Sequence, residues 1–176
     1  MPTSLIVTII ASDRPGLVSA ISDIAAAHGA NWAESLMSHI AGQFAGILHL
    51  QAPPENRERL MAALDALNAQ GFNLQIVAAS DGSERAEARR LQLDLVGQDR
   101  PGIVREISAA LAALGVSIEK LATRIESGAM SGECMFEAHA QLRVPLRVAD
   151  DALRSALEAI ANEMMVDLAL VNTADR

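Results

Sequence analysis

The sequence has few aromatic side chains: no Tyr, one Trp and three Phe in 176 residues. Basic residues are also scarce, with 14 Lys and Arg against 22 Asp and Glu and a net charge of −8. Residues 1–81 hold three basic and seven acidic side chains, and residues 82–176 hold eleven and fifteen, so each half carries −4. Because nucleic-acid binding depends on basic patches and on stacking platforms, we expect no direct nucleic-acid partner.

Cysteine is nearly absent as well. Cys134 is the single cysteine, which excludes an internal disulfide and a cysteine metal cluster and makes a cytoplasmic location the default expectation. The four histidines show no metal-ligand spacing, although His39 and His49 lie on strands that could bring them close. His28 falls on an apolar helix stripe and is expected to be a core residue. No nucleophile–base pair is recognisable, so we expect neither an enzyme, nor a cofactor, nor a bound metal.

Long hydrophobic runs are missing too. No apolar stretch reaches the roughly 18 residues that a membrane-spanning helix needs. Residues 1–12 lack the basic region and the small-residue cleavage site of a signal peptide, and they are typical of a strand. We therefore expect no membrane association. With 51% hydrophobic and 20% charged residues, the composition is that of a globular protein.

The most informative feature present is an internal repeat. SDRPGLVSAISDIAAAHGAN (residues 12–31) returns as QDRPGIVREISAALAALGVS (residues 98–117), with ten of twenty positions identical. We predict a first domain over residues 1–81, a polar linker over 82–89 and a second domain over 90–176. Domains of this size are near the lower limit for one stable core. The first strand is apolar on both faces, so we expect a homo-oligomer.

Periodicity predicts the same order of elements in both halves: strand, helix, strand, strand, helix, strand. This order is the ferredoxin-like pattern, an α+β fold with an antiparallel sheet and both helices on one face. The expected strands are residues 4–12, 31–40, 43–52, 72–80, 90–97, 116–126, 132–144 and 166–172, and the expected helices are residues 17–28, 55–70, 103–114 and 150–164.

The repeated Asp-Arg-Pro-Gly lies where the first strand passes into the first helix of each half. Proline suits the first helical position, and a carboxylate near a helix N-terminus is favoured by roughly 0.3–1 kcal/mol, so the motif can be a rigid turn alone. The same helix end presents unpaired N–H groups to a ligand carboxylate. Gly16 and Gly102 allow close approach, and Asp13 and Asp99 could receive an ammonium group. An amino acid fits this chemistry.

The DRPGLV and DRPGIV motifs, placed at this junction in both repeats, closely resemble the ACT domain, a family of regulatory modules that bind small molecules, often amino acids. The resemblance implies ligands at the interface of two ACT units, between the first loop of one unit and the start of the second strand of its neighbour. Ser117 lacks the amide of Asn31, so the two sites need not be equivalent. The implied ligand-binding residues are Asp13, Arg14, Gly16, Leu17, Asn31, Asp99, Arg100, Gly102, Ile103 and Ser117.

A tandem pair of this length without a catalytic domain is similar to the glycine cleavage system transcriptional repressor group. That resemblance implies a non-catalytic regulator of glycine and one-carbon metabolism, with glycine or serine as ligand and with a protein partner, such as a DNA-binding regulator. Two alternatives stay open at this point. The chain could be a detached regulatory subunit of an amino-acid biosynthetic enzyme, or an interaction module that binds no ligand.

Overall fold

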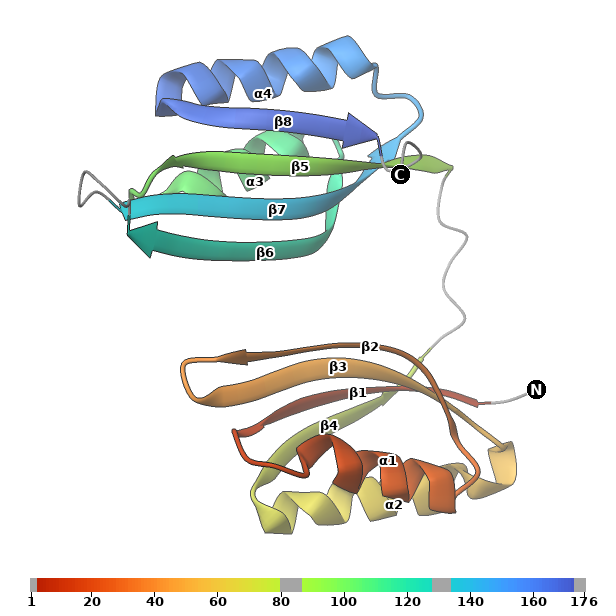
Figure 1. Ribbon diagram of the computed structural model, residues 1–176. Helices are drawn as coiled ribbons and strands as arrows, with labels where there is room; N and C mark the ends of the chain where they lie inside the picture. The colour runs from red at the N-terminus through yellow and green to blue at the C-terminus, as the bar shows by residue number, and fades with distance from the viewer. Residues whose placement is uncertain (1–2, 80–86, 128–133, 173–176) are drawn as a thin grey trace. The chain divides into compact units, whose positions relative to one another are not determined.

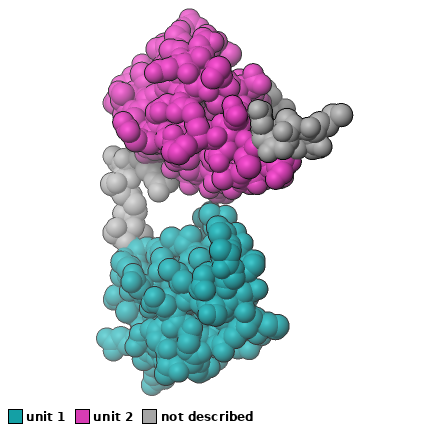
Figure 2. Space-filling view, turned by 90° about the vertical axis from the view of Figure 1, so that its left-hand side faces the viewer, with its two compact units in different colours: residues 1–83 teal, residues 84–176 magenta. Residues whose placement is uncertain are grey.

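The chain divides into two compact units, residues 1–83 (unit 1) and 84–176 (unit 2) (Figure 2). Each unit has its own hydrophobic core. The computed structural model describes residues 3–79, 87–127 and 134–172. Residues 82–86 of the expected linker lie outside the described residues, as does most of the tip of the second hairpin, residues 128–131.

Unit 1 has the order predicted from periodicity. A strand, a helix and two further strands are followed by a second helix and a last strand. A short 3₁₀ turn precedes the second helix and another extends it. The elements are β1 (Thr3–Ser12), α1 (Leu17–Ala27), β2 (Asn31–Ile40), β3 (Gln43–Ala52), η1 (Pro54–Asn56), α2 (Arg57–Asp65), η2 (Ala66–Gln70) and β4 (Phe72–Ala78).

Unit 2 repeats this order, without 3₁₀ turns in its described residues. Its first helix has the same eleven-residue length as α1, and its second helix is a continuous fifteen-residue α-helix. The elements are β5 (Ala88–Gln98), α3 (Ile103–Ala113), β6 (Ser117–Ser127), β7 (Cys134–Pro145), α4 (Asp150–Met164) and β8 (Val166–Asn172).

Each unit consists of two layers. The sheets are antiparallel, with the strand orders β2-β3-β1-β4 and β6-β7-β5-β8, and in each unit both helices lie on one face of the sheet (Figure 1). The expected α+β, ferredoxin-like fold with two tandem βαββαβ units is therefore confirmed. β2 and β6 are edge strands, and both carry a register shift near their start, between Trp32 and Glu34 and between Ile118 and Lys120.

The cores follow the alternation of the strands. Along β1, residues 5, 7, 9 and 11 are buried against the helices, and β5 buries residues 91, 93 and 95 in the same way. The predicted inward residues of the second helices, such as Leu60 and Leu153, are fully buried. No polar or charged side chain is buried among the described residues, so both cores are held by apolar packing alone.

Two local expectations need correction. The second helix of unit 1 is not α-helical over residues 55–70, because its α-helical part ends at Asp65 and tightens into the 3₁₀ turn η2, which closes at Gly71 with a φ of 88°. Pro15 is not the first helical residue. α1 begins at Leu17 and its N-cap is Gly16, so the proline belongs to the turn that precedes the helix.

A matched pair of leucines tests the position of the unit 2 core. Leu142 on β7 is fully buried, whereas Leu146, four residues later, is 56% exposed. Leu142→Ala should lower the free energy of unfolding of unit 2 by about 2–5 kcal/mol because it leaves a cavity. Leu146→Ala should change it by less than about 0.5 kcal/mol. Hydrogen exchange of the β5 amides at increasing urea concentrations measures the free energy of unfolding of both variants. Equal losses in the two variants would contradict the packing described.

Candidate functional site

The Asp-Arg-Pro-Gly turn of unit 1 is held by backbone contacts. The amide of Asp13 donates to the carbonyl of Gly42 at the hairpin between β2 and β3, at 3.1 Å. Gly16 adopts the left-handed conformation, with φ of 92°, and serves as the N-cap of α1. Its carbonyl accepts the first helical hydrogen bond from the amide of Ala20. This conformation favours glycine, so the backbone requires the glycine that ends the motif.

Unit 2 builds the same turn. The amide of Asp99 donates to the carbonyl of Cys134 at 2.8 Å, and Gly102 is the N-cap of α3 with φ of 101°. The amide of Glu106 donates to the carbonyl of Gly102 at 3.0 Å. The repeated motif therefore encodes one backbone shape twice, and any difference between the two turns comes from their side chains.

The arginines of the two turns have different partners. In unit 1, Arg14 donates through Nη2 to the carbonyl of Gln70 at 2.7 Å, and its guanidinium lies 5.4 Å from the centre of the Phe72 ring, within cation–π range. This arginine therefore links the turn to the segment between η2 and β4. Sequence reasoning did not identify Gln70 or Phe72, which become neighbours of the motif only through the tertiary fold.

In unit 2, Arg100 forms a bidentate ion pair with Glu106, at 3.2 Å from Nη1 to Oε1 and 2.8 Å from Nη2 to Oε2. Phe72 pairs with Ala11 in the sheet of unit 1, and at the same position in unit 2 Val166 pairs with Gly97. Arg100 therefore has no aromatic ring at this position. The hydrogen bond with Arg100 is the main cause that lowers the pKa of the Glu106 carboxyl, and the same bond raises the pKa of Arg100.

The two helix N-termini also differ in accessibility. A side-chain carbon built on Gly16 would meet nothing within 4 Å, so the space beside this glycine is open. At Gly102 the carboxylate oxygen Oε1 of Glu106 lies 3.3 Å from that position. In unit 1 the equivalent of Glu106 is Ala20, four residues after the glycine in both motifs. The first turn of α3 thus contains an acidic side chain, while the first turn of α1 contains none.

The histidines do not form a metal site. His39 pairs with Phe44 on the helix-covered face of the sheet, whereas His49 pairs with Ile6 on the opposite face, so the two side chains point apart. His39 instead lies 3.7 Å from the carboxylate of Asp13, with both side chains about half exposed. His28 is partly buried and hydrogen-bonded to the carbonyl of Ile24. The described residues contain no group of three metal-ligating side chains.

One unit does not bring all the predicted site residues together. In the registers of unit 1, Ser12 lies level with Gln43 and Ile40, whereas Asn31 lies level with Gln51 and Ser4. Asn31 is therefore at the other end of the sheet from the Asp13 turn, about 30 Å away at 3.3 Å per residue. Ser117 is separated from the Asp99 turn in the same way, because it pairs with Arg143, which pairs with Arg90.

Unit 2 contains a hollow that sequence reasoning did not anticipate. It lies between α3 and the sheet, with about 370 Å³ of empty space including its mouth, and its lining is apolar apart from Ser108. Smaller side chains in unit 2 explain the hollow in part. Ile118 and Ala140 stand at the sheet positions that Trp32 and Leu48 occupy in unit 1. The predicted site residue Ile103 lines this hollow.

Comparison with known proteins supports the fold assignment. Residues 3–78 match the family model of the ACT domain. The chain is 26% identical to an unknown protein from Galdieria sulphuraria, with a TM-score of 0.86 over 98% of this chain and 99% of that one. It is 18% identical to a protein described as a "putative glycine cleavage system transcriptional repressor", with a TM-score of 0.69 over 97% and 96%. No curated protein matches the chain.

These findings agree with the residues that first indicated the family. The matched segment covers β1 to β4 and includes the first Asp-Arg-Pro-Gly turn, and unit 2 repeats both the topology and the turn. The solved structure described as a repressor establishes a likeness of fold over nearly the whole chain and nothing more. Unit 1 therefore matches the ACT domain family, and unit 2 repeats its topology and its turn, so the chain is a tandem pair of units with this fold.

Proposed function

We propose that this chain is a non-catalytic regulatory protein that binds a small amino acid through its ACT units and thereby changes its association with a protein partner. The observation that carries the proposal is the turn at the start of α1. It combines an open N-terminus at Gly16 with an exposed acidic side chain at Asp13. The two groups offer complementary charges to the two ends of an amino acid.

The chemistry of binding follows from this arrangement. The first N–H groups of α1 have no partner within the helix, and the helix dipole favours an anion there, so they suit the ligand carboxylate. The Asp13 carboxylate suits the ligand ammonium group, and a hydrogen bond between charged groups is stronger than a neutral one. Because Gly16 has no side chain, the ligand can approach the backbone closely. A small side chain, as in glycine or serine, fits the family resemblance.

A second ACT unit would complete the site. Asn31 cannot reach the Asp13 turn of its own unit, because about 30 Å of sheet separates them. Two antiparallel edge strands place the start of one strand beside the end of the other, so a neighbouring unit could supply the missing residue. Val18 and Val104, which directly follow the paired positions Leu17 and Ile103, are both exposed, as expected of apolar contacts with another unit.

The two turns are proposed to have different roles. At α3 the Glu106 carboxylate already lies beside Gly102 and neutralises Arg100, so it competes with a ligand carboxylate for the same helix end. We therefore assign ligand binding to the turn of unit 1 and a structural role to the turn of unit 2. The ligand-free alternative raised by the sequence is thus favoured for unit 2 alone.

Regulation would follow from linkage. A ligand that contacts two units stabilises the arrangement that forms its site, in proportion to the difference in affinity between the two arrangements. The likeness of fold to a protein described as a repressor supports a partner among transcriptional regulators of glycine and one-carbon metabolism. The net charge of −8 supports a protein partner rather than DNA itself. No observation favours a detached subunit of a biosynthetic enzyme.

A screen of the twenty amino acids by thermal unfolding tests ligand binding. We expect glycine or serine to raise the melting temperature of unit 1 by several degrees. A ligand at 100 times its Kd stabilises the folded state by about 2.7 kcal/mol. No shift with any amino acid at millimolar concentration would rule out the amino-acid sensor.

A matched pair of variants tests which turn binds. Asp13→Asn removes the negative charge that pairs with the ligand ammonium group and should weaken binding about 10- to 100-fold, the loss expected for a charged hydrogen bond. Asp99→Asn makes the same change in unit 2 and should leave the affinity unchanged. Isothermal titration calorimetry measures both affinities. Weaker binding in Asp99→Asn alone would assign the ligand to unit 2. Replacement of Gly16 is less informative, because any side chain there is strained at its positive φ.

The ion pair that we propose to exclude ligand from unit 2 can be tested by pH. In the folded state the pKa of Glu106 lies below its ordinary value of 4.5, because its carboxylate accepts hydrogen bonds from Arg100. The pair therefore stabilises unit 2 above about pH 4.5, and this contribution is lost as the pH falls through the lowered pKa. In an NMR titration, Arg100→Gln should raise the pKa of Glu106 towards 4.5, whereas Arg14→Gln should not. An unchanged pKa in Arg100→Gln would disprove the pair.

A further inference from the structure

The face of the unit 1 sheet that points away from α1 and α2 carries several large exposed apolar side chains among Ser, Thr, Asn, Gln and His side chains, and almost no charge. We call it the open face of unit 1. In the strand registers it consists of residues 4, 6, 8, 10 and 12 of β1, 34, 36, 38 and 40 of β2, the odd residues 43–51 of β3, and 73, 75 and 77 of β4. Glu34 is the single Asp, Glu, Lys or Arg among them. Its large exposed apolar side chains are Ile10 (51%), Leu36 (57%), Ile40 (71%), Ile47 (45%) and Val77 (62%).

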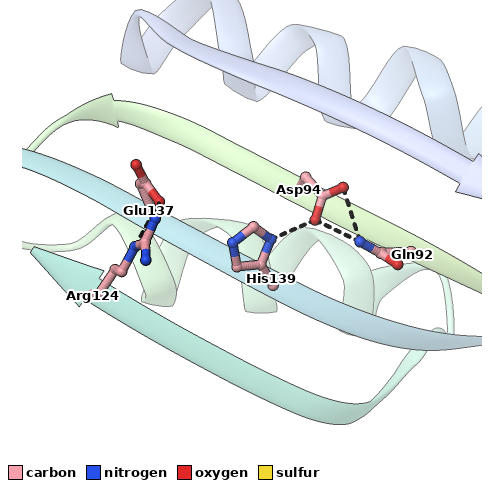
Figure 3. Close-up of polar contacts among 5 residues, drawn as sticks. All are labelled: Gln92, Asp94, Arg124, Glu137 and His139. Carbon is pink, nitrogen blue, oxygen red and sulfur yellow. Dashed lines mark hydrogen bonds and ion pairs between the residues drawn. The ribbon is translucent and has the colours of Figure 1, made fainter.

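The matching face of unit 2 is charged. There, Asp94 and His139 occupy the positions of Thr8 and Ile47, each pair being direct neighbours on the two central strands. Nδ1 of His139 lies 2.6 Å from Oδ1 of Asp94, and Gln92 donates to both oxygens of the same carboxylate (Figure 3).

A second charged pair extends this network. Nε of Arg124 donates to Oε2 of Glu137 at 2.7 Å, on neighbouring positions of β6 and β7 (Figure 3). In unit 1 the same two positions hold Ser38 and Ala45. One chain thus contains the same sheet twice, once with a network of charges on its open face and once with exposed isoleucine, leucine and valine among largely uncharged side chains.

This contrast indicates that the two faces have different surroundings. The charged side chains of unit 2 are partly exposed and paired with one another, as expected of a surface in contact with water. Large contiguous apolar patches are rare on monomeric proteins and mark interaction sites. Each Å² of apolar surface removed from water contributes about 25 cal/mol. The five large exposed apolar side chains and the near absence of charge on the open face of unit 1 are therefore typical of an interaction surface.

We propose that the open face of unit 1 is a self-association surface, covered by the same face of a second copy of this chain. Electrostatics favour this occupant. The chain carries −8, so two copies repel one another over most of their surfaces and can approach through a face with one carboxylate at its edge strand. Two identical patches related by a two-fold axis form a closed dimer.

Shape also fits this occupant. Large side chains, Ile10 and Ile47, alternate along the two central strands with the small Thr8 and Ala45, their direct neighbours in the register. Such alternation lets the side chains of two packed sheets interdigitate. Four strands about 4.8 Å apart and about seven residues long form a face of roughly 19 by 23 Å. Two such faces would bury about 900 Å² in a dimer, without the extra area of protruding side chains. Stable interfaces begin near 1,000–1,200 Å², so we expect a reversible, concentration-dependent dimer.

Sedimentation velocity of the full chain between about 1 and 200 μM tests the proposal. We expect the wild-type chain to shift from monomer to dimer over this range. The double variant Thr8→Asp/Ile47→His, which copies the pair found in unit 2, should remain monomeric, with dimerisation weakened at least tenfold. A wild-type chain that is monomeric throughout would overturn the proposal and leave the face to another occupant.

A matched pair of single variants provides the control. Val77 and Val171 hold the same position in the last strand of each unit, opposite Ile6 and Gln92, and both are exposed. Val77→Asp should weaken dimerisation at least tenfold, whereas Val171→Asp should leave it unchanged. Circular dichroism checks that each variant folds. If the double variant does not fold, the two valine variants decide whether the open face of unit 1 is the dimer interface. Equal dimerisation of the two valine variants would refute the assignment to unit 1.

Discussion

The glycine that ends each Asp-Arg-Pro-Gly motif is the constraint on which the proposed site depends. At φ of 92° and 101°, Gly16 and Gly102 adopt a conformation that side-chain-bearing residues rarely adopt. Each glycine lets the chain leave the last residue of a central strand and enter a helix within a four-residue turn. The helix then lies on the buried face of its own strand, with its N-terminus at the end of the sheet. The requirement holds with or without a ligand, so the repeat of the motif is first a requirement of the backbone.

The function we propose rests on what differs between the two turns. Both have the same backbone, yet Arg14 contacts Phe72 and the carbonyl of Gln70, whereas Arg100 is held by Glu106. The first arrangement leaves the start of α1 open, and the second places a carboxylate at the start of α3. The same divergence appears on the sheets, because the open face of unit 1 carries a single carboxylate and that of unit 2 carries a network of charged pairs. The two copies keep the same fold but differ at a helix N-terminus and on a sheet face. One copy can therefore bind a ligand or a partner while the other keeps a charged surface in contact with water.

Much of the fold could be predicted from the sequence, because it is local. The β-branched run in residues 4–12 and the helical stripe from Leu17 onwards predict a strand and a helix, and the second half of the chain predicts the same order of elements again. The site was predicted only in part. The 3₁₀ turn after Asp65 and the partners of Arg14 depend on tertiary contacts that no periodicity encodes. The distance between Asn31 and Asp13 follows from the sheet register. Glu106 was visible four residues after Gly102, but its effect required the geometry of the turn.

The most direct test of the proposed site is to observe the backbone amides at the two helix N-termini while ligand is added. In ¹⁵N-labelled full-length protein titrated with glycine or serine, we expect the amide signals of Leu17, Val18 and Ser19 to shift in a saturable manner. Those of Ile103, Val104 and Arg105 should stay in place, because the Glu106 carboxylate already lies at that helix start. Saturable shifts at α3 with none at α1, or shifts at neither helix, would contradict the assignment of the ligand to unit 1.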